Sequence, residues 1–125
     1  MKNAIFNDLG LALLRIGASA LLLTHGFPKF QKLISGNLEF GDPIGIGAAP
    51  TLFLAVLAEF ICPILIILGY KTRWAAVFPA VTMVVAAFIV HAQDAMDVKE
   101  KALLFLMAFV CISLLGPGKY SIDKK

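Results

Sequence analysis

Four long apolar stretches divide the chain, and most charged residues lie between them. The stretches cover approximately residues 9–26, 51–69, 74–91 and 102–116, and we expect the last helix to begin at 98. At about 1.5 Å per residue, a helix needs about 20 residues to cross the hydrocarbon core of a bilayer. The stretches are apolar on all sides rather than along one stripe, which favours membrane-spanning helices over a soluble helical bundle.

Prolines occur inside two of these stretches, at Pro63 in the second and at Pro79 in the third. A proline removes one backbone hydrogen bond from a helix, but membrane helices tolerate this loss where their neighbours satisfy the freed carbonyl group. The prolines therefore do not exclude either stretch from crossing the membrane.

The long connection after the first stretch has two parts. In GFPKFQKLISG, residues 26–36, apolar side chains recur at helical spacing with Lys29 and Lys32 between them, which predicts a short helix in the headgroup region. The turn-rich segment that follows, residues 38–50, is expected to fold back over the mouth of the bundle.

Composition agrees with this pattern. Of the 125 residues, 60% are apolar and 15% are charged, whereas about a quarter of an ordinary soluble domain is charged. The mean hydropathy is +0.90. The length suits one domain, so we expect residues 1–125 to form a single all-α domain, an integral membrane four-helix bundle with a short interfacial helix after span one.

Lysine and arginine residues predict the orientation in the membrane. Four spans place both termini on one side, and the positive-inside rule assigns the more basic side to the cytoplasm. The side of the termini carries Lys2, Lys71, Arg73, Lys119, Lys124 and Lys125, and the opposite side carries Lys29, Lys32, Lys99 and Lys101. We therefore expect a multi-pass protein of the cytoplasmic membrane with both termini in the cytoplasm. The basic residues form no surface with aromatic residues of the kind that nucleic acid requires, so no nucleic-acid partner is expected.

Two charged residues, Arg15 and Glu59, lie inside the apolar stretches. An ionisable group in the hydrocarbon core is costly unless it is paired or hydrated, so each of the two implies a partner. Counted from the cytoplasmic ends of their spans, Arg15 lies about 9 Å deep and Glu59 about 15 Å deep, a difference that an arginine side chain can bridge. We expect a bidentate ion pair between them, which either fixes the helix register or belongs to a ligand site.

A turn of about 100° per residue groups the polar and small residues of three spans into helix faces. The first span places Arg15, Ser19, Leu22, Gly26 and Lys29 on one face. The second places Ala55, Glu59, Cys62 and Ile66 together, and the fourth places Glu100, Leu104, Met107 and Cys111 together. The face of the first span is expected to contact protein rather than lipid.

A polar cluster is expected near the outer membrane surface, where the sequence places His25, Lys29, His91, Asp94 and Glu100 at similar heights. Two histidines and two acids could relay protons or hold a metal ion. Such residues are more often solvated at the membrane interface, and no metal site is expected.

The two cysteines, Cys62 and Cys111, lie in spans that run in the same direction, and they could lie at matching depth. This makes them candidate redox thiols. No C-x-x-C motif is present, and a buried thiol resists forming the thiolate that redox chemistry requires.

Four segments together resemble one protein family: LLRIGASALLLTHGFPKF, AEFICPILIILGYKTRWAA, KEKALLFLMAF and GPGKYSID. The chain resembles the DoxX family of small four-span membrane proteins of bacteria and archaea, and the resemblance covers nearly the whole length. The motif positions are Arg15, Gly17, His25, Gly26, Lys29, Glu59, Arg73, Glu100, Ser121, Ile122 and Asp123.

The resemblance implies a four-helix bundle in the cytoplasmic membrane. Relatives in the family include the small subunit of an archaeal thiosulfate:quinone oxidoreductase, and others are linked to thiol and oxidative-stress defence. The family offers no agreed catalytic residues. The sequence has no signature for haem, flavin or an iron–sulfur cluster, so no covalently bound cofactor is expected.

Two functions fit these observations. The first is a redox-associated membrane subunit that binds a quinone or a similar amphiphile, with a redox protein or a soluble thiol as electron donor. The ligand would contact Arg15, His25, Lys29, Glu59, His91 and Glu100. The second is a non-enzymatic scaffold, assembly factor or small-solute carrier, which as a homo-oligomer would use the alanines of the third span for close helix contact. The sequence leaves open whether the protein is an enzyme.

Overall fold

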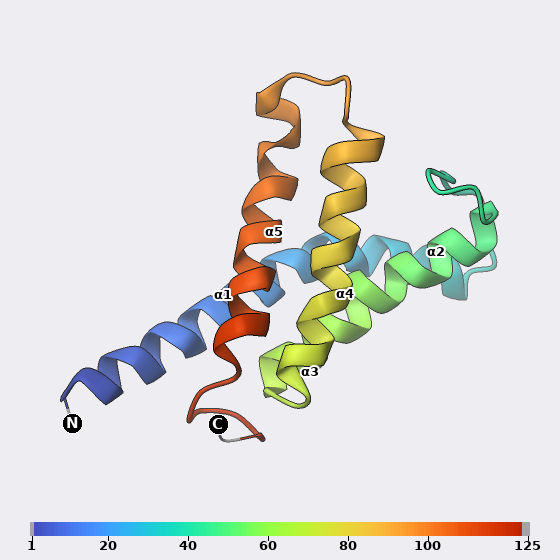
Figure 1. The fold of residues 1–125 in the computed structure, drawn as a ribbon. Helices are drawn as coiled ribbons and strands as arrows, with labels where there is room; N and C mark the ends of the chain where they lie inside the picture. Colours follow the sequence, from blue (N-terminus) through green and yellow to red (C-terminus); the bar gives the residue numbers. More distant parts are fainter. Residues whose placement is uncertain (1, 124–125) are drawn as a thin grey trace.

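The computed structural model describes residues 2–123, and every regular element in that range is helical. Figure 1 shows the arrangement, in which η denotes a π-helical segment. In chain order the elements are α1 (Lys2–Ile34), α2 (Ala48–Val56), η1 (Leu57–Ile61), α3 (Cys62–Leu68), α4 (Thr72–Val85), η2 (Ala86–Val90) and α5 (Met96–Leu115).

These elements form four rods, because η1 joins α2 to α3 and η2 continues α4 without a break. Three of the rods, Ala4–Ile34, Ala48–Leu68 and Thr72–Val90, are long and apolar enough to cross a membrane. The fourth rod, α5, has 20 residues and begins with a charged first turn, and it covers the fourth predicted span. The predicted all-α, four-helix membrane fold is confirmed.

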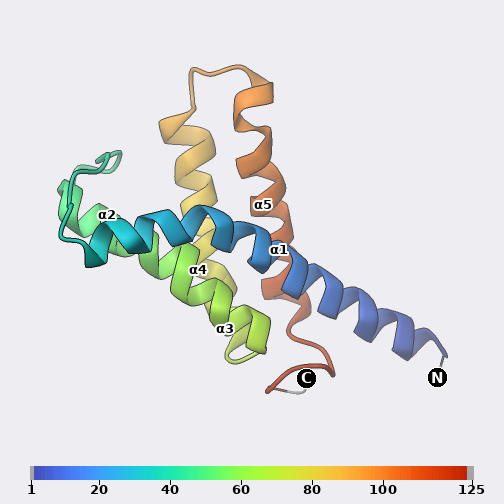
Figure 2. The same cartoon turned by 180° about the vertical axis from the view of Figure 1, so that it is seen from behind.

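The rods pack as two crossed pairs. In Figures 1 and 2, α4 and α5 stand side by side and antiparallel, while α1 runs obliquely across them. The rod α2–η1–α3 lies antiparallel against α1 and contacts it along its whole length. From the turn at residues 69–71, α4 rises away from α2, and the two helices diverge.

Helix α1 is longer than the first predicted span. Residues 27–34 are helical, as expected, but they continue α1 instead of forming a separate interfacial helix. The helix contains Pro28 and ends only at a Schellman motif, in which Gly36 has a φ of 82° and the Asn37 N–H donates to the Lys32 carbonyl at 3.1 Å. Its 33 residues span about 50 Å, more than the roughly 30 Å hydrocarbon core, so α1 extends beyond the core or tilts within it.

Small residues allow the close contact between α4 and α5. Ala75, Ala76 and Ala87 are buried in the same cluster as Phe109 and Ile112 of α5. The alanines of the third span are therefore used largely for packing within the chain.

The C-terminal segment folds back under the turn between α3 and α4. The Ile122 N–H donates to the Leu68 carbonyl at 3.1 Å, and the Asp123 N–H donates to the Gly69 carbonyl at 2.9 Å. The Asp123 carboxylate in turn accepts a hydrogen bond from the Thr72 N–H at 3.1 Å, at the start of α4. Of the basic residues that predict orientation, Lys124 and Lys125 lie outside the described residues.

Candidate functional site: the Lys29–Glu59 cavity

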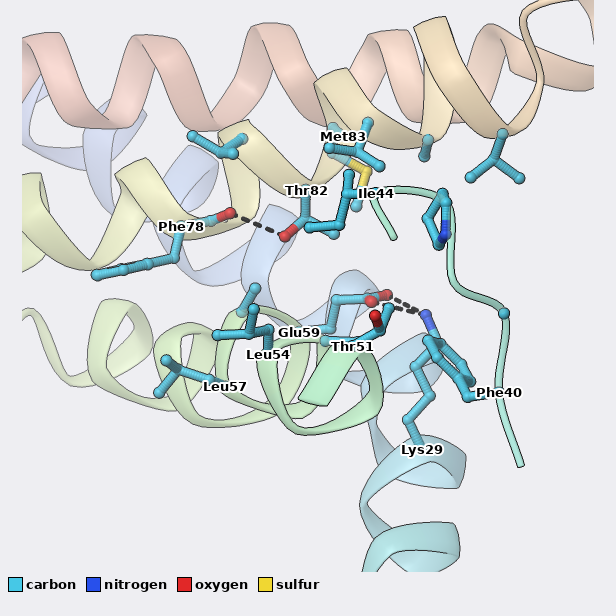
Figure 3. A pocket seen from close by; sticks show the side chains of 18 of the residues that line it. Lys29, Phe40, Ile44, Thr51, Leu54, Leu57, Glu59, Phe78, Thr82 and Met83 are labelled. Atoms are coloured by element: carbon cyan, nitrogen blue, oxygen red, sulfur yellow. Dashed lines mark hydrogen bonds and ion pairs between the residues drawn. The ribbon is translucent and has the colours of Figure 1, made fainter. Parts of the chain in front are cut away.

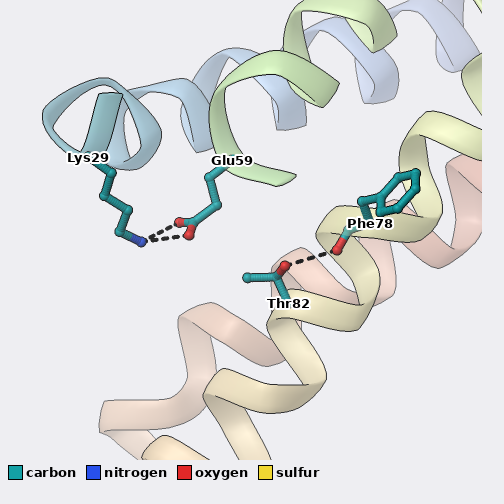
Figure 4. Close-up of polar contacts among 4 residues, drawn as sticks. All are labelled: Lys29, Glu59, Phe78 and Thr82. Atoms are coloured by element: carbon teal, nitrogen blue, oxygen red, sulfur yellow. Dashed lines mark hydrogen bonds and ion pairs between the residues drawn. The ribbon is translucent and has the colours of Figure 1, made fainter. Parts of the chain in front are cut away.

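Glu59 is buried in the middle of the second rod, with 4% of its surface exposed. The Lys29 ammonium group lies 2.7 Å from one carboxylate oxygen and 2.6 Å from the other, so the pair is bidentate (Figure 4). The side chain of Lys29 is 29% exposed. A buried carboxylate in a membrane helix is therefore neutralised by a cation that retains contact with the outside.

Backbone features of two helices bring this pair together. Pro63 has no N–H group to bond the Glu59 carbonyl, and the helix locally widens to a π-helix, in which the Cys62 N–H donates to Leu57. Gly26 packs directly against the freed carbonyl, because a Cβ atom added there would lie 2.0 Å from the Glu59 oxygen. Only glycine permits this approach, and Lys29 lies one turn further along the same face of α1.

The predicted pairing of Arg15 with Glu59 is wrong. Arg15 is buried, with 1% of its surface exposed, and its guanidinium group donates to three carbonyl oxygens. These are Ile66 at 2.8 Å, Ile67 at 2.6 Å and Tyr120. The last carbonyls of a helix lack intrahelical partners and carry partial negative charge, so the end of α3 attracts the arginine.

The sequence placed Arg15 and Glu59 within reach of each other because it compared their depths from the ends of their own spans. Because α1 and the second rod are antiparallel, Arg15 lies beside the end of α3, while Gly26 lies beside Glu59. The eleven residues from Arg15 to Gly26 correspond to about 16 Å along the helix. Depth counted from the ends of the apolar stretches did not include this stagger between the two helices.

The face of the first span that the sequence predicts to contact protein is confirmed as buried, apart from the partly exposed Lys29, and the residues grouped on the second and fourth spans differ from each other in burial. On α1, Arg15, Ser19, Leu22 and Gly26 are buried, and on the second rod Ala55, Glu59, Cys62 and Ile66 are buried. The predicted face of α5, with Glu100, Leu104, Met107 and Cys111, is exposed. Helix α5 instead buries Ala102, Phe109 and Ile112, because these residues face α4 and the core.

A cavity of about 570 Å³ lies beside the ion pair, between the diverging helices α2 and α4 (Figure 3). Apolar side chains of both rods form most of its wall, including Leu54 and Leu57 on one side and Phe78 and Met83 on the other. Its polar residues are Lys29, Thr51, Glu59, Thr82 and His91. This volume falls within the range of about 300–1,000 Å³ that is typical of ligand sites.

Both π-helical segments border the cavity. Leu57, Ala58 and Glu59 of η1 lie in its wall, and Ala86 and Val90 of η2 lie opposite. Single turns of π-helix inside longer helices are rare and occur frequently at functional sites. Their shared position makes this cavity the strongest candidate site within residues 2–123.

The connection between α1 and α2 covers one end of the cavity. Phe40 and Ile44 line it, and the Lys29 ammonium group lies 5.9 Å from the centroid of the Phe40 ring (Figure 3). Asp42 holds the connection in shape by accepting hydrogen bonds from the Ile46 and Gly47 N–H groups, both at 2.9 Å. The prediction that this segment folds back over the mouth of the bundle agrees with these contacts.

Hydrogen bonding also affects the acidity of Asp42, which lies outside the membrane-spanning helices. Desolvation alone would raise the pKa of this carboxyl group. Hydrogen bonds from the Gly47 and Ile46 N–H groups and from the Thr51 hydroxyl outweigh that effect, so the pKa of Asp42 is lowered. The carboxylate that shapes the connection is therefore ionised at neutral pH.

The remaining predicted site residues are distributed over separate places. His91 lines the cavity and bonds Asp94, with its Nδ1 atom 2.7 Å from the carboxylate. His25 lines a second, smaller cavity between α1 and α5, and Glu100 is exposed. Of the predicted outer cluster, Lys29 and His91 thus share one site, and within the described residues no group of three or more potential ligands is placed to hold a metal ion.

The two cysteines occupy different environments. Cys62 is buried in the core, Cys111 is exposed on α5, and both are free thiols. Their role as redox thiols stays a prediction.

Thr51 and Thr82 are cavity residues that the sequence pattern did not indicate. The Thr82 hydroxyl donates to the Phe78 carbonyl at 3.0 Å and faces the ion pair across the cavity (Figure 4). A single threonine in an apolar helix is common, because its hydroxyl can bond the preceding turn, so its residue type alone gives no signal.

Comparison with known proteins agrees with the sequence resemblance. The family model described as DoxX matches residues 10–92. The chain is 31% identical to the inner membrane protein YqjF of Escherichia coli (strain K12), and the match covers 94% of this chain and 92% of the relative. It is 32% identical to an uncharacterized protein of Haemophilus influenzae (strain ATCC 51907 / DSM 11121 / KW20 / Rd), over 92% of this chain and 89% of the relative. No solved structure matches the chain. The chain is therefore a multi-pass membrane protein that belongs to the DoxX family.

Proposed function

We propose that the Lys29–Glu59 cavity binds the polar head of a quinone or a similar amphiphile, and that the protein serves as a redox-associated membrane subunit. One observation carries the proposal: a buried bidentate ion pair lies in the wall of an otherwise largely apolar cavity. Ligand sites combine apolar walls with a small number of polar groups that orient the ligand.

The apolar rim suits entry from the bilayer. Leu54, Phe78 and Val81 line the cavity and are 47%, 49% and 57% exposed. Since they belong to membrane-spanning helices, their exposed surfaces face acyl chains. An amphiphile that enters between α2 and α4 keeps its tail among these side chains while its head reaches Lys29 and Glu59.

The polar groups match both redox forms of a quinone. A quinone carbonyl accepts a hydrogen bond from the Lys29 ammonium group, and a quinol hydroxyl donates one to the Glu59 carboxylate. Reduction of a quinone takes up two electrons and two protons. Two soluble thiols supply both when they are oxidised to a disulfide, and a redox partner protein supplies the electrons with protons drawn from water.

A binding titration tests the proposal. Purified protein in detergent is titrated with a short-chain quinol kept in its reduced form, and the heat of binding is measured for the natural chain and for Glu59→Gln. We expect saturable binding that weakens about ten-fold in Glu59→Gln, because the hydrogen bond from the quinol hydroxyl to the charged carboxylate becomes a bond to a neutral amide.

The matched control for this titration is Glu39→Gln, a carboxylate on the exposed connection that does not line the cavity. It should bind like the natural chain. Absence of saturable binding, or equal affinity in Glu59→Gln and the natural chain, would contradict the proposal.

We also propose that the protein resides in the cytoplasmic membrane with both termini in the cytoplasm. The relative from E. coli is described as an inner membrane protein, and the side of the termini is the more basic one. Fusions at the C-terminus test the orientation: green fluorescent protein should fluoresce and alkaline phosphatase should be inactive. An active phosphatase fusion would contradict the proposed orientation and place the C-terminus outside the cytoplasm.

The alternative function as a scaffold or homo-oligomer receives less support. Ala76 and Ala87 are fully buried against the rest of the chain, so these small residues do not form an open contact face.

A further inference from the structure

We propose that a second site, in the groove between α1 and α5, binds the headgroup of an anionic phospholipid. The groove has a volume of about 360 Å³ and shares no lining residue with the Lys29–Glu59 cavity, which lies between α2 and α4. Its α1 wall includes Leu21, Thr24 and His25, and its α5 wall includes Lys101, Leu104 and Phe105.

The cationic residue of the groove, Lys101, has no acidic partner. Within residues 2–123, Lys101 makes no hydrogen bond or ion pair, and the His25 ring makes no hydrogen bond and lies edge-on to the Phe105 ring, with centroids 6.0 Å apart. The Thr24 hydroxyl donates to the Leu21 carbonyl at 2.6 Å. Lys101 and His25 therefore keep their N–H donors available, in contrast to Lys29, whose charge is matched by Glu59.

The neighbouring acid does not cancel this charge. Glu100 precedes Lys101 in the chain, but successive residues of a helix point about 100° apart. Asp97 lies one turn before Lys101 on the same face, but within residues 2–123 it forms no ion pair with Lys101, and neither acid lines the groove. No aspartate or glutamate belongs to the groove. A bound anion would therefore meet only cationic or neutral groups.

The walls of the groove favour a lipid over a free anion. Leu21 and Leu104 are 62% and 56% exposed, and Ala18 and Ala108 leave room for an acyl chain between the helices. Lys101 is the sixth residue of α5, about 7.5 Å from the start of that helix, where a lysine reaches headgroup level. A phospholipid that places its phosphodiester at Lys101 and His25 and an acyl chain along Leu21 and Leu104 would contact both the polar and the apolar parts of the groove.

Native mass spectrometry of the full chain in detergent tests this site. The protein is titrated with phosphatidylglycerol, with phosphatidylcholine of the same chains and with inorganic phosphate. We expect retained, saturable binding of phosphatidylglycerol and weaker binding of the zwitterionic lipid. Lys101→Gln should weaken phosphatidylglycerol binding about five-fold, the effect of one lysine near an anionic headgroup.

Two further variants make the test specific. Lys99→Gln removes a lysine two residues away on the same helix and outside the groove, so it should bind phosphatidylglycerol like the natural chain. Ala108→Leu fills the space for the acyl chain without changing any charge, and it should also weaken binding.

The possible outcomes separate clearly. An equal loss of phosphatidylglycerol affinity in Lys99→Gln and Lys101→Gln would show a general attraction of the lipid to basic residues and would overturn the site. Equal binding of the two lipids would overturn it as well. Saturation by inorganic phosphate with the same affinity as the lipid would leave an anion site and would overturn the assignment to phospholipid.

Discussion

Arg15 and Lys29 lie on the same face of α1, fourteen residues apart, but their charges are satisfied in different ways. Arg15 is enclosed, and its Nη1 and Nη2 groups donate to the carbonyls of Ile66, Ile67 and Tyr120, which are fixed parts of the backbone. Lys29 bonds a carboxylate beside a cavity and remains partly exposed. The difference separates a residue that holds the fold together from one that can exchange its partner for a ligand.

The surroundings of the two residues support this division. Arg15 ties three segments together: α1, the end of α3 and the C-terminal segment. Gly69 allows this contact, because a Cβ atom there would lie 3.0 Å from the guanidinium group and 2.2 Å from the Ser121 Cβ. Lys29 and Glu59 instead lie where α2 and α4 diverge and where side-chain packing leaves a cavity.

The largest expected effect is that of Arg15→Ala. It removes three hydrogen bonds to backbone carbonyl groups and opens a void, so we expect a loss of about 3–5 kcal/mol in the free energy of unfolding. Denaturant unfolding in detergent measures it. The control is Arg73→Ala, which removes an exposed arginine with one hydrogen bond, to the Leu114 carbonyl, and should lose about 1 kcal/mol or less. Equal losses in the two variants would contradict the structural role of Arg15.

Gly26→Ala should have the next largest effect. The added Cβ meets the Glu59 carbonyl oxygen and carbon at 2.0 and 2.4 Å, which are backbone atoms that cannot rotate away. We expect a loss of about 2–3 kcal/mol in the same assay, together with weaker quinone binding.

A matched glycine lies on the same helix. Gly17 has no atom within 4 Å of an added Cβ, so Gly17→Ala should stabilise the protein by up to about 1 kcal/mol through helix propensity. A destabilisation by Gly17→Ala as large as that by Gly26→Ala would show that helix contact is not the cause.

Glu59→Gln should lower the free energy of unfolding less than Arg15→Ala or Gly26→Ala. The amide still accepts a hydrogen bond from Lys29, and the partly exposed ammonium group gains contact with water, so we expect a loss of about 1 kcal/mol. Thermal unfolding measures it, and a loss as large as that of Arg15→Ala would assign the ion pair a structural role.

The smallest effect concerns Asp42 and pH. Because the pKa of Asp42 is lowered in the folded protein, its contribution to stability is fully present above its ordinary value of 3.8 and is lost as the pH falls through the folded pKa. Protease cleavage within residues 37–47 should therefore increase on acidification in the natural chain. In Asp42→Asn it should be higher at neutral pH and change less with pH. Glu39→Gln is the control, and the same pH profile in Asp42→Asn as in the natural chain would contradict this role.

The sequence predicted the helices and the buried face of the first one, because both follow from apolar runs and from a repeat of about 100°. It also singled out Lys29, Glu59 and His91, which line one cavity. Residue patterns could not give the partner of Arg15, since its acceptors are backbone carbonyls and every residue has one.

The sequence also could not predict the stagger between α1 and the second rod. It depends on the contact of Gly26 with the Glu59 carbonyl and on the end of α3, which only the packed helices define. The same stagger decides that Lys29, and not Arg15, reaches the carboxylate.

A titration of Glu59→Gln and Arg15→Lys with a short-chain quinol, side by side and corrected for the folded fraction, tests most directly whether the ligand-binding role belongs to the Lys29–Glu59 pair and the structural role to Arg15. We predict that Glu59→Gln remains folded but binds about ten-fold more weakly, whereas Arg15→Lys is less stable and its folded fraction binds like the natural chain. Normal binding by Glu59→Gln together with lost binding by folded Arg15→Lys would contradict the account.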